Sequence, residues 1–523
     1  MSNPEISVPD QFNMVKVLID DHLEEGRASQ PAVYWQGKTL TYLNLAEMVN
    51  RCGNALRKLG LQAEQRALII LNDSPNFLAT FLGAMKIGAV PVPTNPLATP
   101  SDYEYFLNDS RAKVVVLEEE FLEKIEAVLS NLKFLQHVVV VGNNPRGHES
   151  FSKLLESCTA ELECFPTHRD DASYWLYSSG TTGQPKGVVH YHGDMMYCVN
   201  HYSRHVIDLK QTDRLFSASK LFFSYGLVNS LYLPLLGGAS VVLYPGRPEP
   251  ESLLQVIGES HPTIFFSVPT SYAAILREME EKQKPADLSS VRHCVSAGEA
   301  LPPAILERWK NRFGLEILDG VGSTEGGYIF ISNRPGSVRL GSSGKLIPGY
   351  EARLVDESGV EVKAGEVGDL LLRSPSTAAY YWHKKNKSTE TFLGEWLRTG
   401  DKYYREEDGY HYFAGRSDDL FKVSGIWVSP IEIEKTLLEH DAVAECAVIS
   451  KADENSLEKP RAFVVLKSGY QPGPVLVQEL QAFVKQRLAP YKYPRWIEFV
   501  PELPRTTTGK VQRFKLRGGS NVN

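Results

Sequence analysis

One stretch of eleven residues, Tyr177 to Gly187, constrains this chain more than any other. It holds three glycines, five hydroxyl side chains and one lysine, between an apolar run (174–176) and two β-branched valines (188–189). Glycines let backbone amides point into a concavity, hydroxyls donate hydrogen bonds, and Lys186 adds positive charge. A flexible linker needs neither strand-like flanks nor one placed lysine. The stretch therefore predicts a loop that closes on phosphate.

The best-known phosphate loop, Walker A, does not fit this stretch. It requires Gly, four residues and then Gly-Lys-Ser/Thr. Counting from Gly180, Pro185 precedes Lys186 and Gly187 follows it, so the pattern fails at two positions. The phosphate loop is therefore of another kind.

Length and composition limit the class of protein. A chain of 523 residues exceeds what one hydrophobic core usually organises, so we expect two or more domains. Apolar content of 42% and charged content of 23% are ordinary for a globular protein. The net charge of -7 offers no basic surface for a nucleic-acid partner. Local lysines and arginines must meet any anionic ligand.

Targeting and cysteine patterns indicate a cytoplasmic protein without a membrane partner. Residues 1–11 are polar, which predicts no signal peptide, and no apolar run reaches the ~18 residues that span a bilayer. The six cysteines contain no Cys-x-x-Cys pair, so we interpret them as reduced thiols.

The alternation of patterns along the first part of the chain predicts an α/β fold. A helical pattern at 43–59 is followed by short apolar runs at 66–71, 89–92 and 113–117. Beyond the phosphate loop, strands are expected at 239–244 and 263–268 and a helix at 301–312, whereas 143–164 reads as a polar loop. Helices and strands that alternate in this way favour a largely parallel sheet.

The character of the sequence changes twice further on. From about residue 336 it becomes a set of short, glycine-punctuated β pieces, for example 350–355 and 369–373. After Asp418 a compact α+β pattern follows, with helices at 431–440 and 475–488 and strands at 443–450, 461–467 and 496–500. We therefore expect a large domain of mixed, mostly parallel sheets with a β-rich subdomain (1–417) and a small α+β domain (418–523).

Five further stretches carry groups that suit a nucleotide. A strand-to-helix turn at 296–300 suits a base or ribose. The segment 319–326 contains Glu325, a carboxylate of the kind that holds Mg²⁺ against phosphates. Asp401 can accept ribose hydroxyls and Arg416 can pair with phosphate. Lys510 lies in a Thr/Gly loop near the end. Taken singly, each is an ordinary turn.

The order and spacing of these stretches resemble the adenylate-forming superfamily across nearly the whole chain. This superfamily includes acyl-CoA synthetases, adenylation domains of peptide synthetases and beetle luciferases. The resemblance implies that ATP and a carboxylic acid form an acyl-adenylate and pyrophosphate, after which a thiol takes the acyl group. It implies ATP, Mg²⁺ and coenzyme A as cofactor and co-substrates.

The resemblance also implies a set of nucleotide contacts. Residues 178–187 would hold the β and γ phosphates, and 298–300 with 319–324 would surround the adenine, with Val321 where many relatives have a tyrosine. Glu325 matches the magnesium ligand, with Thr181 or Thr182 as its hydroxyl helper. The ATP-binding residues are thus expected to be Ser178, Ser179, Gly180, Thr181, Thr182, Gly183, Lys186, Gly298, Glu299, Ala300, Asp319, Gly320, Val321, Gly322, Ser323, Thr324, Asp401 and Arg416.

The resemblance implies that different carboxy-terminal residues serve the two steps of the reaction. Lys510 matches the catalytic lysine that bridges the carboxylate and the α-phosphate, which is electrostatic and positioning catalysis. Asp418 matches the hinge of a mobile small domain. After rotation, the loop around Gly425 would line a tunnel for the pantetheine arm of CoA. The expected CoA contacts are Lys422, Ser424, Gly425 and Trp427.

Two stretches, 220–226 and 326–329, carry clues to the acid. Aromatic and small residues together suit a flat aryl ring, and both stretches, together with 423–430, look most like the benzoate-CoA ligase branch. The expected substrate contacts are Ser224, Tyr225, Gly226, Gly322, Tyr328 and Ile329. That branch usually has histidine at position 328 and alanine or glycine at 224. The two extra hydroxyls favour a ring-substituted acid, such as 2-aminobenzoate or a hydroxybenzoate.

Other functions stay open beside an aryl-CoA ligase. A stand-alone adenylation enzyme would load the acid onto a separate carrier protein, and a homodimer also remains open. A luciferase-like enzyme is disfavoured by the small pocket and the missing Ser-Lys-Leu ending. A non-catalytic regulator would have no use for Lys510. The pairs His190/His192 and His201/His205 lack a His-Glu-x-x-His pattern, so we interpret them as structural.

Overall fold

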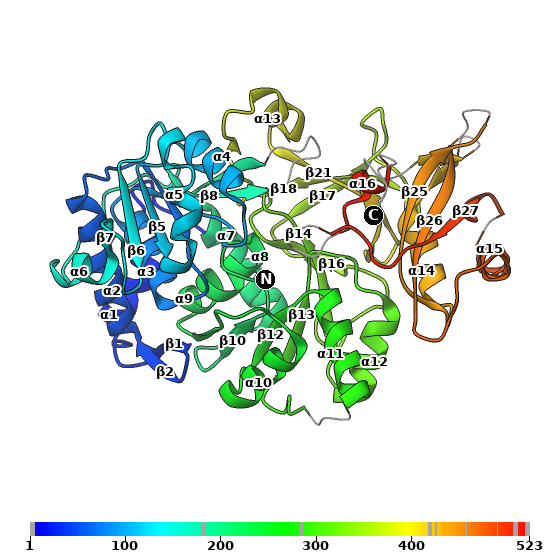
Figure 1. Ribbon diagram of the computed structural model, residues 1–523, viewed down its shortest axis with the longest axis horizontal. Coiled ribbons are helices and arrows are strands. Elements are labelled where there is room, and N and C mark those ends of the chain that lie inside the picture. The colour runs from blue at the N-terminus through cyan, green and yellow to red at the C-terminus, as the bar shows by residue number, and fades with distance from the viewer. Residues whose placement is uncertain are drawn as a thin grey trace. The chain divides into compact units, whose positions relative to one another are not determined.

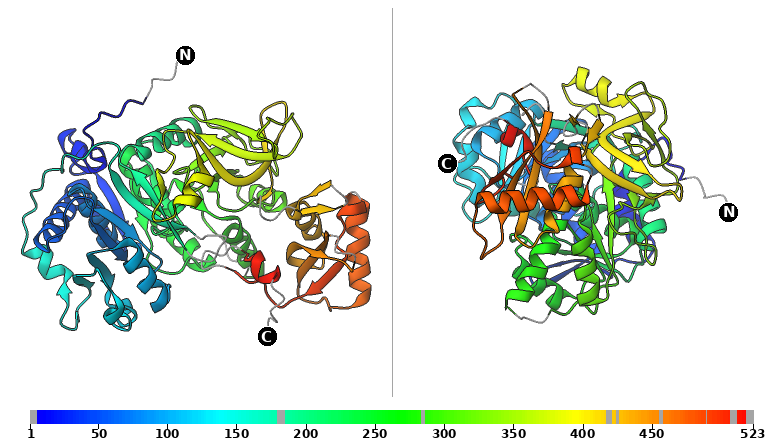
Figure 2. Two further views of the ribbon diagram at one scale, coloured as in Figure 1. Left: turned by 90° about the horizontal axis from the view of Figure 1, so that it is seen from above. Right: turned by 90° about the vertical axis from the view of Figure 1, so that its right-hand side faces the viewer.

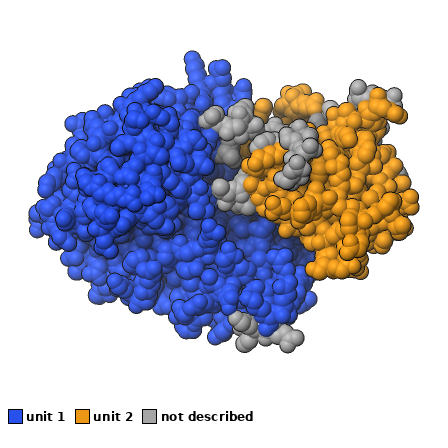
Figure 3. Space-filling view, in the orientation of Figure 1, with its two compact units in different colours: residues 1–352, 372–397 blue, residues 353–371, 398–523 orange. Residues whose placement is uncertain are grey.

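A computed structural model describes residues 6–178, 185–282, 286–416, 421–423, 426–454, 458–488, 490–505 and 511–517. The chain forms two compact units (Figure 3). Unit 1 comprises residues 1–352 and 372–397, and unit 2 comprises residues 353–371 and 398–523. The predicted domain boundary at Asp418 lies outside the described residues, so a division at that position stays a prediction.

The largest sheet of unit 1 has nine strands in the order β16-β15-β14-β13-β12-β10-β11-β1-β2. The six strands from β14 to β1 are parallel, and antiparallel neighbours close both ends. Its strands are β1 (Pro31–Trp35), β2 (Lys38–Thr41), β10 (Arg214–Ser217), β11 (Ser240–Leu243), β12 (Ile264–Ser267), β13 (His293–Ser296), β14 (Ile317–Gly322), β15 (Ile329–Ser332) and β16 (Lys345–Leu346).

Three helices lie beside this sheet (Figure 1): α10 (Pro250–Ser260), α11 (Pro269–Lys282) and α12 (Pro303–Phe313). They bury Ile257, Tyr272 and Trp309 in one apolar cluster with Phe265 of β12. Because parallel strands begin and end at common edges, the carboxyl ends of β12, β13 and β14 lie side by side.

A second, fully parallel sheet has the order β4-β3-β5-β6-β7. Helix α2 (Tyr42–Lys58) begins at Thr41, which exchanges capping hydrogen bonds with Asn44, and α2 packs against the buried α3 (Pro75–Lys86). The strands are β3 (Arg66–Ile70), β4 (Val90–Pro93), β5 (Val114–Glu118), β6 (His137–Val141) and β7 (Glu149–Ser150).

A third sheet, β19-β9-β8, carries the predicted phosphate loop. It consists of β8 (Ala172–Ser178), β9 (Lys186–Tyr191) and β19 (Tyr380–Tyr381), all antiparallel. The remaining helical segments of unit 1 are η1 (Lys16–Asp20), α1 (Asp21–Glu24), α4 (Pro100–Ser110), η2 (Glu119–Phe121), α5 (Leu122–Glu126), η3 (Leu129–Asn131), α6 (Phe151–Glu156), α7 (Asp194–Tyr202), η4 (Ser203–Ile207), α8 (Ser224–Leu227), η5 (Val228–Tyr232), α9 (Leu233–Gly237) and α13 (Lys385–Thr391).

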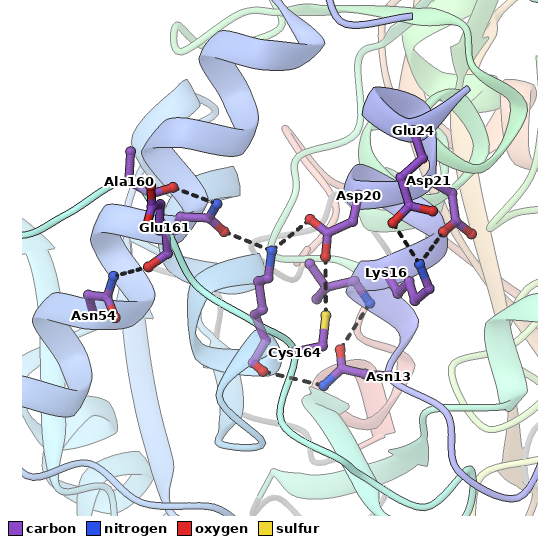
Figure 4. Close-up of polar contacts among 12 residues, drawn as sticks. Asn13, Lys16, Asp20, Asp21, Glu24, Asn54, Ala160, Glu161 and Cys164 are labelled. Carbon is purple, nitrogen blue, oxygen red and sulfur yellow. Dashed lines mark hydrogen bonds and ion pairs between the residues drawn. The ribbon is translucent and has the colours of Figure 1, made fainter. Parts of the chain in front are cut away.

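A buried polar cluster fastens the amino-terminal segment of unit 1 (Figure 4). The ammonium of Lys86, whose side chain is 1% exposed, lies 2.6 Å from Oδ1 of Asp20 and 2.8 Å from Oδ1 of Asn50. Cys164 Sγ lies 3.3 Å from the other oxygen of Asp20. Three distant segments therefore meet at one carboxylate, which satisfies a buried charge.

Unit 2 carries most of the sheet β17-β18-β21-β20, with β22 paired to β21, and a separate sheet β25-β26-β27. Two helices cover β25-β26-β27 (Figure 2), burying Leu437 and Leu480 against Val464. Of these strands, β20 (Phe392–Leu393) belongs to unit 1. The other elements are β17 (Glu351–Val355), β18 (Gly368–Arg373), β21 (Trp396–Arg405), β22 (His411–Arg416), β23 (Phe421–Val423), β24 (Ile426–Val428), α14 (Pro430–Leu438), β25 (Val443–Ala452), β26 (Glu458–Leu466), α15 (Pro474–Arg487), η6 (Pro490–Lys492), β27 (Trp496–Phe499) and α16 (Arg513–Arg517).

The structure confirms the predicted α/β fold class and corrects one segment. The expected helix at 43–59 and the expected strands at 66–71 and 113–117 correspond to α2, β3 and β5. The loop expected at 143–164 was wrong in part, because it contains β7 and α6, whose Phe151 packs inward. No helix within the described ranges is long and apolar enough to cross a bilayer.

Candidate active site

The hairpin β8–β9 brings the two ends of the predicted phosphate loop together. Ser178 and Lys186 are register partners across it, and Tyr105 donates from its hydroxyl to the carbonyl of Pro185 at 2.7 Å. Residues 179–184, which include the expected contacts Ser179, Gly180, Thr181, Thr182 and Gly183, lie outside the described residues.

Lys186 meets Glu325 and a tyrosine that sequence reasoning did not single out. The Nζ atom of Lys186 lies 2.7 Å from the hydroxyl of Tyr381 and 3.1 Å from Oε1 of Glu325. Tyr381 donates to the same oxygen at 2.8 Å, and the ammonium lies 3.9 Å from the centre of its ring. Since the three residues come from β9, the turn after β14 and β19, only the tertiary fold assembles them.

The Glu325 carboxylate is held in its charged form. Burial by itself raises its pKa, but the charge of Lys186 and the hydrogen bond from Tyr381 outweigh burial and lower the pKa below its ordinary value. The group is therefore an anion in a largely enclosed place, with side chains of Lys186 and Glu325 only 16% and 15% exposed.

A buried histidine supports the turn that carries Glu325. Nε2 of His190 lies 2.7 Å from the carbonyl oxygen of Thr324 and must donate to it, and Nδ1 shares a proton with Asp194 at 2.8 Å. The backbone N–H of Ala378 donates to the carbonyl of Glu325 at 2.7 Å. His190 is thus structural in its contacts, as expected, and adjoins the site.

The expected adenine contacts lie at adjacent strand ends. Ser296 and Asp319 are register partners in β13 and β14, so Gly298, Glu299 and Ala300 leave the sheet beside Gly320, Val321 and Gly322. Gly322 cannot be replaced there, because an added Cβ would lie 2.4 Å from the carbonyl oxygen of Tyr328. Ser323 Oγ accepts from the N–H of Gly326 at 3.0 Å and shapes the turn through Thr324.

The expected substrate residues form an aromatic group in unit 1. The rings of Tyr225 and Tyr328 are stacked, with centroids 6.2 Å apart and planes at 22°, and Tyr202 meets Tyr328 edge-on at 4.9 Å. Ser224 and Gly226 flank Tyr225 in α8, and Ile329 follows Tyr328 into β15, where it is 1% exposed.

A buried ion pair anchors the start of the stretch 220–226. Asp73, which is 3% exposed, accepts from the N–H of Leu221 at 3.0 Å and faces Lys220 Nζ at 3.7 Å. Burial raises the pKa of Asp73 and lowers the pKa of Lys220. The loop that precedes α8 is therefore tied at both its backbone and its side chain.

In unit 2 the structure pairs Asp401 with Arg416. They are register partners in β21 and β22, and Arg416 Nη1 lies 2.7 Å from Oδ1 of Asp401. Lys422 and Trp427 pair across the hairpin β23–β24, but their side chains are not described. The expected hinge Asp418, the CoA contacts Ser424 and Gly425, and Lys510 lie outside the described residues.

Comparison with known proteins places the chain in a family. Residues 21–382 match the family model of the AMP-binding enzymes, and residues 432–510 match the AMP-binding enzyme C-terminal domain. The chain is a member of the AMP-binding enzyme family.

Relatives of this AMP-binding enzyme share its full length. It is 48% identical to benzoate–CoA ligase of Thauera aromatica, over 98% of this chain and 97% of the relative. The crystal structure of an anthranilate CoA ligase in complex with anthranoyl-AMP matches with a TM-score of 0.92 and 45% identity, covering 98% of this chain and 97% of that one. A benzoate CoA ligase of Burkholderia xenovorans LB400 matches with a TM-score of 0.88 and 43% identity, covering 97% of this chain and 100% of that one. The resemblance inferred from the sequence is confirmed.

Two neighbours of the site in this AMP-binding enzyme escaped sequence reasoning. Tyr381 lies in a run of aromatic residues with no recognisable motif, 195 positions after Lys186. Asn229, which accepts a hydrogen bond from the hydroxyl of Tyr328, follows the substrate stretch in an apolar helical run. Nothing local in the sequence distinguishes either residue from core packing.

Proposed function

We propose that this AMP-binding enzyme is an AMP-forming CoA ligase for aromatic carboxylic acids. The observation that carries the proposal is its full-length similarity to ligases named for benzoate and anthranilate. The stacked pair Tyr225 and Tyr328 supports it, because flat apolar faces suit an aryl ring.

The reaction proceeds in two steps. In the first, a carboxylate oxygen of the acid attacks the α-phosphorus of ATP, and the bond to pyrophosphate breaks. In the second, the thiol of CoA loses its proton and attacks the acyl carbon, and AMP leaves. A thiol near neutral pH is already a few per cent ionised, so the second step needs no strong base.

Lys186 and Glu325 are proposed to receive the phosphates and Mg²⁺. Mg²⁺ favours one or two carboxylates completed by phosphate oxygens and water. Glu325 offers one ionised, enclosed carboxylate beside the phosphate loop, which matches this coordination preference. The described residues contain no cluster of three acidic, histidine or cysteine ligands that would bind a metal without the phosphates. Bound there, Mg²⁺ would neutralise phosphate charge. Thr181 or Thr182 is proposed to assist it.

The remaining nucleotide contacts are proposed from matched positions. The strand ends carrying Gly298 to Ala300 and Asp319 to Thr324 would surround the adenine. Asp401 would accept the ribose hydroxyls, with Arg416 held beside it by their ion pair. The rest of the phosphate contacts would come from the loop 178–187.

The small carboxy-terminal domain is proposed to serve both steps. Lys510 would stabilise charge on the carboxylate and α-phosphate in adenylation. Rotation at Asp418 would then exchange Lys510 for a pantetheine tunnel formed with Lys422, Ser424, Gly425 and Trp427. The proposed substrate is benzoate or, because of Ser224 and Tyr328, a ring-substituted benzoate such as 2-aminobenzoate.

Pyrophosphate release tests the proposal. We would compare benzoate, 2-aminobenzoate, hydroxybenzoates, cyclohexanecarboxylate and hexanoate, each with and without CoA. The expected result is many turnovers only when an aryl acid and CoA are both present. A single burst of bound adenylate that CoA does not discharge would contradict the CoA ligase and indicate a carrier protein as acceptor.

A further inference from the structure

A chain of hydrogen bonds links Tyr328 to the core of unit 1. The hydroxyl oxygen of Tyr328 lies 2.5 Å from Oδ1 of Asn229, a fully buried residue of η5. Nδ2 of Asn229 lies 3.4 Å from Oγ of Ser217, and that oxygen lies 3.0 Å from the carbonyl oxygen of Ser219. The chain ends at a backbone group that can only accept.

This end fixes the direction of every bond in the chain. Ser217 donates its single hydroxyl proton to the carbonyl of Ser219, so its oxygen accepts from the amide NH₂ of Asn229. The amide oxygen of Asn229 is then left to face Tyr328. Tyr328 therefore donates its only hydroxyl proton to Asn229, and its oxygen keeps only lone pairs.

The hydroxyl proton of Tyr225, the other tyrosine of the stacked pair, is also donated to a neighbouring group. The hydroxyl of Tyr225 lies 3.3 Å from the carbonyl oxygen of Val295 and must donate to it. Both hydroxyl oxygens can therefore accept a further hydrogen bond, but neither has a proton left to donate.

We propose that Tyr328, held by Asn229, selects aryl acids whose ring carries a hydrogen-bond donor. The class is exemplified by aminobenzoates, and ring substituents that only accept, such as fluoro or methoxy, are disfavoured. This inference rests on the proposed function, in which Tyr328 contacts the ring. An amino N–H against the Tyr328 oxygen completes a hydrogen bond, whereas a fluoro group sets lone pair against lone pair in a buried place. Asn229 is a positioning residue that acts through Tyr328.

The test is kcat/KM for CoA thioester formation with benzoate and with amino-, methyl- and fluorobenzoates at each ring position. Methyl matches amino in size without offering a donor. At the favoured ring position, we expect kcat/KM for the aminobenzoate to exceed that for the methylbenzoate by about tenfold. Tyr328→Phe should reduce that ratio to about one. Tyr232→Phe removes a hydroxyl from another fully buried tyrosine and should leave the ratio unchanged.

A second variant separates positioning from packing. Asn229→Leu keeps much of the volume but frees the Tyr328 proton to turn toward the ring. Activity on methoxy- and fluorobenzoates should then rise relative to aminobenzoates, a reversal that a merely structural role would not produce.

Three outcomes would overturn the inference. The first is a ratio of kcat/KM for aminobenzoate to kcat/KM for methylbenzoate that Tyr328→Phe leaves unchanged. The second is a wild-type enzyme that prefers the fluorobenzoate over the aminobenzoate at every ring position. Both leave the proposed function standing if benzoate is converted. Failure of every aryl acid, benzoate included, to yield a CoA thioester would overturn the proposed function and this inference together.

Discussion

Glu325 depends on two neighbours for its charge, and Tyr381 is the one that can be removed most cleanly. Tyr381→Phe deletes the hydroxyl that donates to Glu325 and contacts Lys186. Because a hydrogen bond to a charged group contributes about 1.5–3 kcal/mol, we expect kcat/KM for ATP to fall about tenfold or more. Tyr380→Phe, at the exposed neighbouring tyrosine, is the control and should have little effect.

The same variant should move the acid limb of the pH profile. The folded-state pKa of Glu325 is lowered, so its charge is present above the ordinary carboxyl pKa and is lost only as pH falls through the lower folded value. Without the Tyr381 hydroxyl that pKa rises, and the acid limb of kcat/KM for ATP should shift to higher pH. An unshifted limb would mean that Glu325 ionisation does not govern ATP use.

A substitution of His190 tests whether the turn after β14 needs the hydrogen bond that His190 donates to it. His190→Phe retains a ring to stack on Tyr174 but leaves the carbonyl of Thr324 and the carboxyl of Asp194 without their partner. We expect a loss of about 1–3 kcal/mol in unfolding free energy, measured by urea denaturation. If Glu325 holds Mg²⁺ as proposed, the Mg²⁺ concentration for half-maximal rate should rise by severalfold. A metal dependence equal to that of wild type would show that Glu325 holds its position without His190.

Helix α8 tolerates no side chain at its third residue. A Cβ at Gly226 would lie 2.1 Å from the backbone carbonyl oxygen of Lys220, the residue that Asp73 anchors. Because the backbone must move, Gly226→Ala should cost about 1–3 kcal/mol of unfolding free energy and displace the stretch 220–226. The first effect is visible as a lower Tm and, if this stretch contacts the acid as proposed, the second as a raised KM for the acid. Gly258→Ala in α10, where the space is open, should be neutral or stabilising. Equal Tm values for the two variants would refute this account.

Most elements could be predicted because their signals are local. The helix α2 has an amphipathic run and a threonine cap, and β3 and β5 are short apolar runs. The six-residue α6 was missed because one and a half turns offer too few positions to reveal a period. Within the candidate site, the glycine-rich turn was readable, whereas Tyr381 and Asn229 act through partners as far as 195 and 99 positions away. Such contacts are decided by packing, which no local pattern encodes.

At the scale of the whole molecule, the proposed chemistry is divided between the two units. In unit 2, the ion pair between Arg513 and Glu434 includes a residue that lies close in sequence to Lys510. Arg513 makes hydrogen bonds of 2.9 and 2.8 Å to the two carboxylate oxygens of Glu434, and a bridge between Arg505 and Val511 joins the ends of the intervening segment. Arg513→Met removes the bidentate contact. If Lys510 acts in adenylation, pyrophosphate release should slow about tenfold.

The two steps can be measured separately in that variant. Thioester formation from isolated aryl-adenylate and CoA should stay near the wild-type rate, because Lys510 is not assigned to that step. Arg487→Met, which breaks an exposed ion pair between α15 and Glu439, is the control and should change neither step. Equal slowing of both steps would indicate general damage to unit 2.

The contact between Lys186 and Glu325 couples the binding of the nucleotide phosphates to the binding of the metal ion. Without ligand, each charge serves as the counter-ion of the other. Phosphates that draw Lys186 away leave Glu325 in need of a cation, and a metal on Glu325 releases Lys186 for the phosphates. By thermodynamic linkage, each arrival strengthens the other to the same degree. On the proposed roles, free nucleotide and free metal are poor ligands and their complex is a good one.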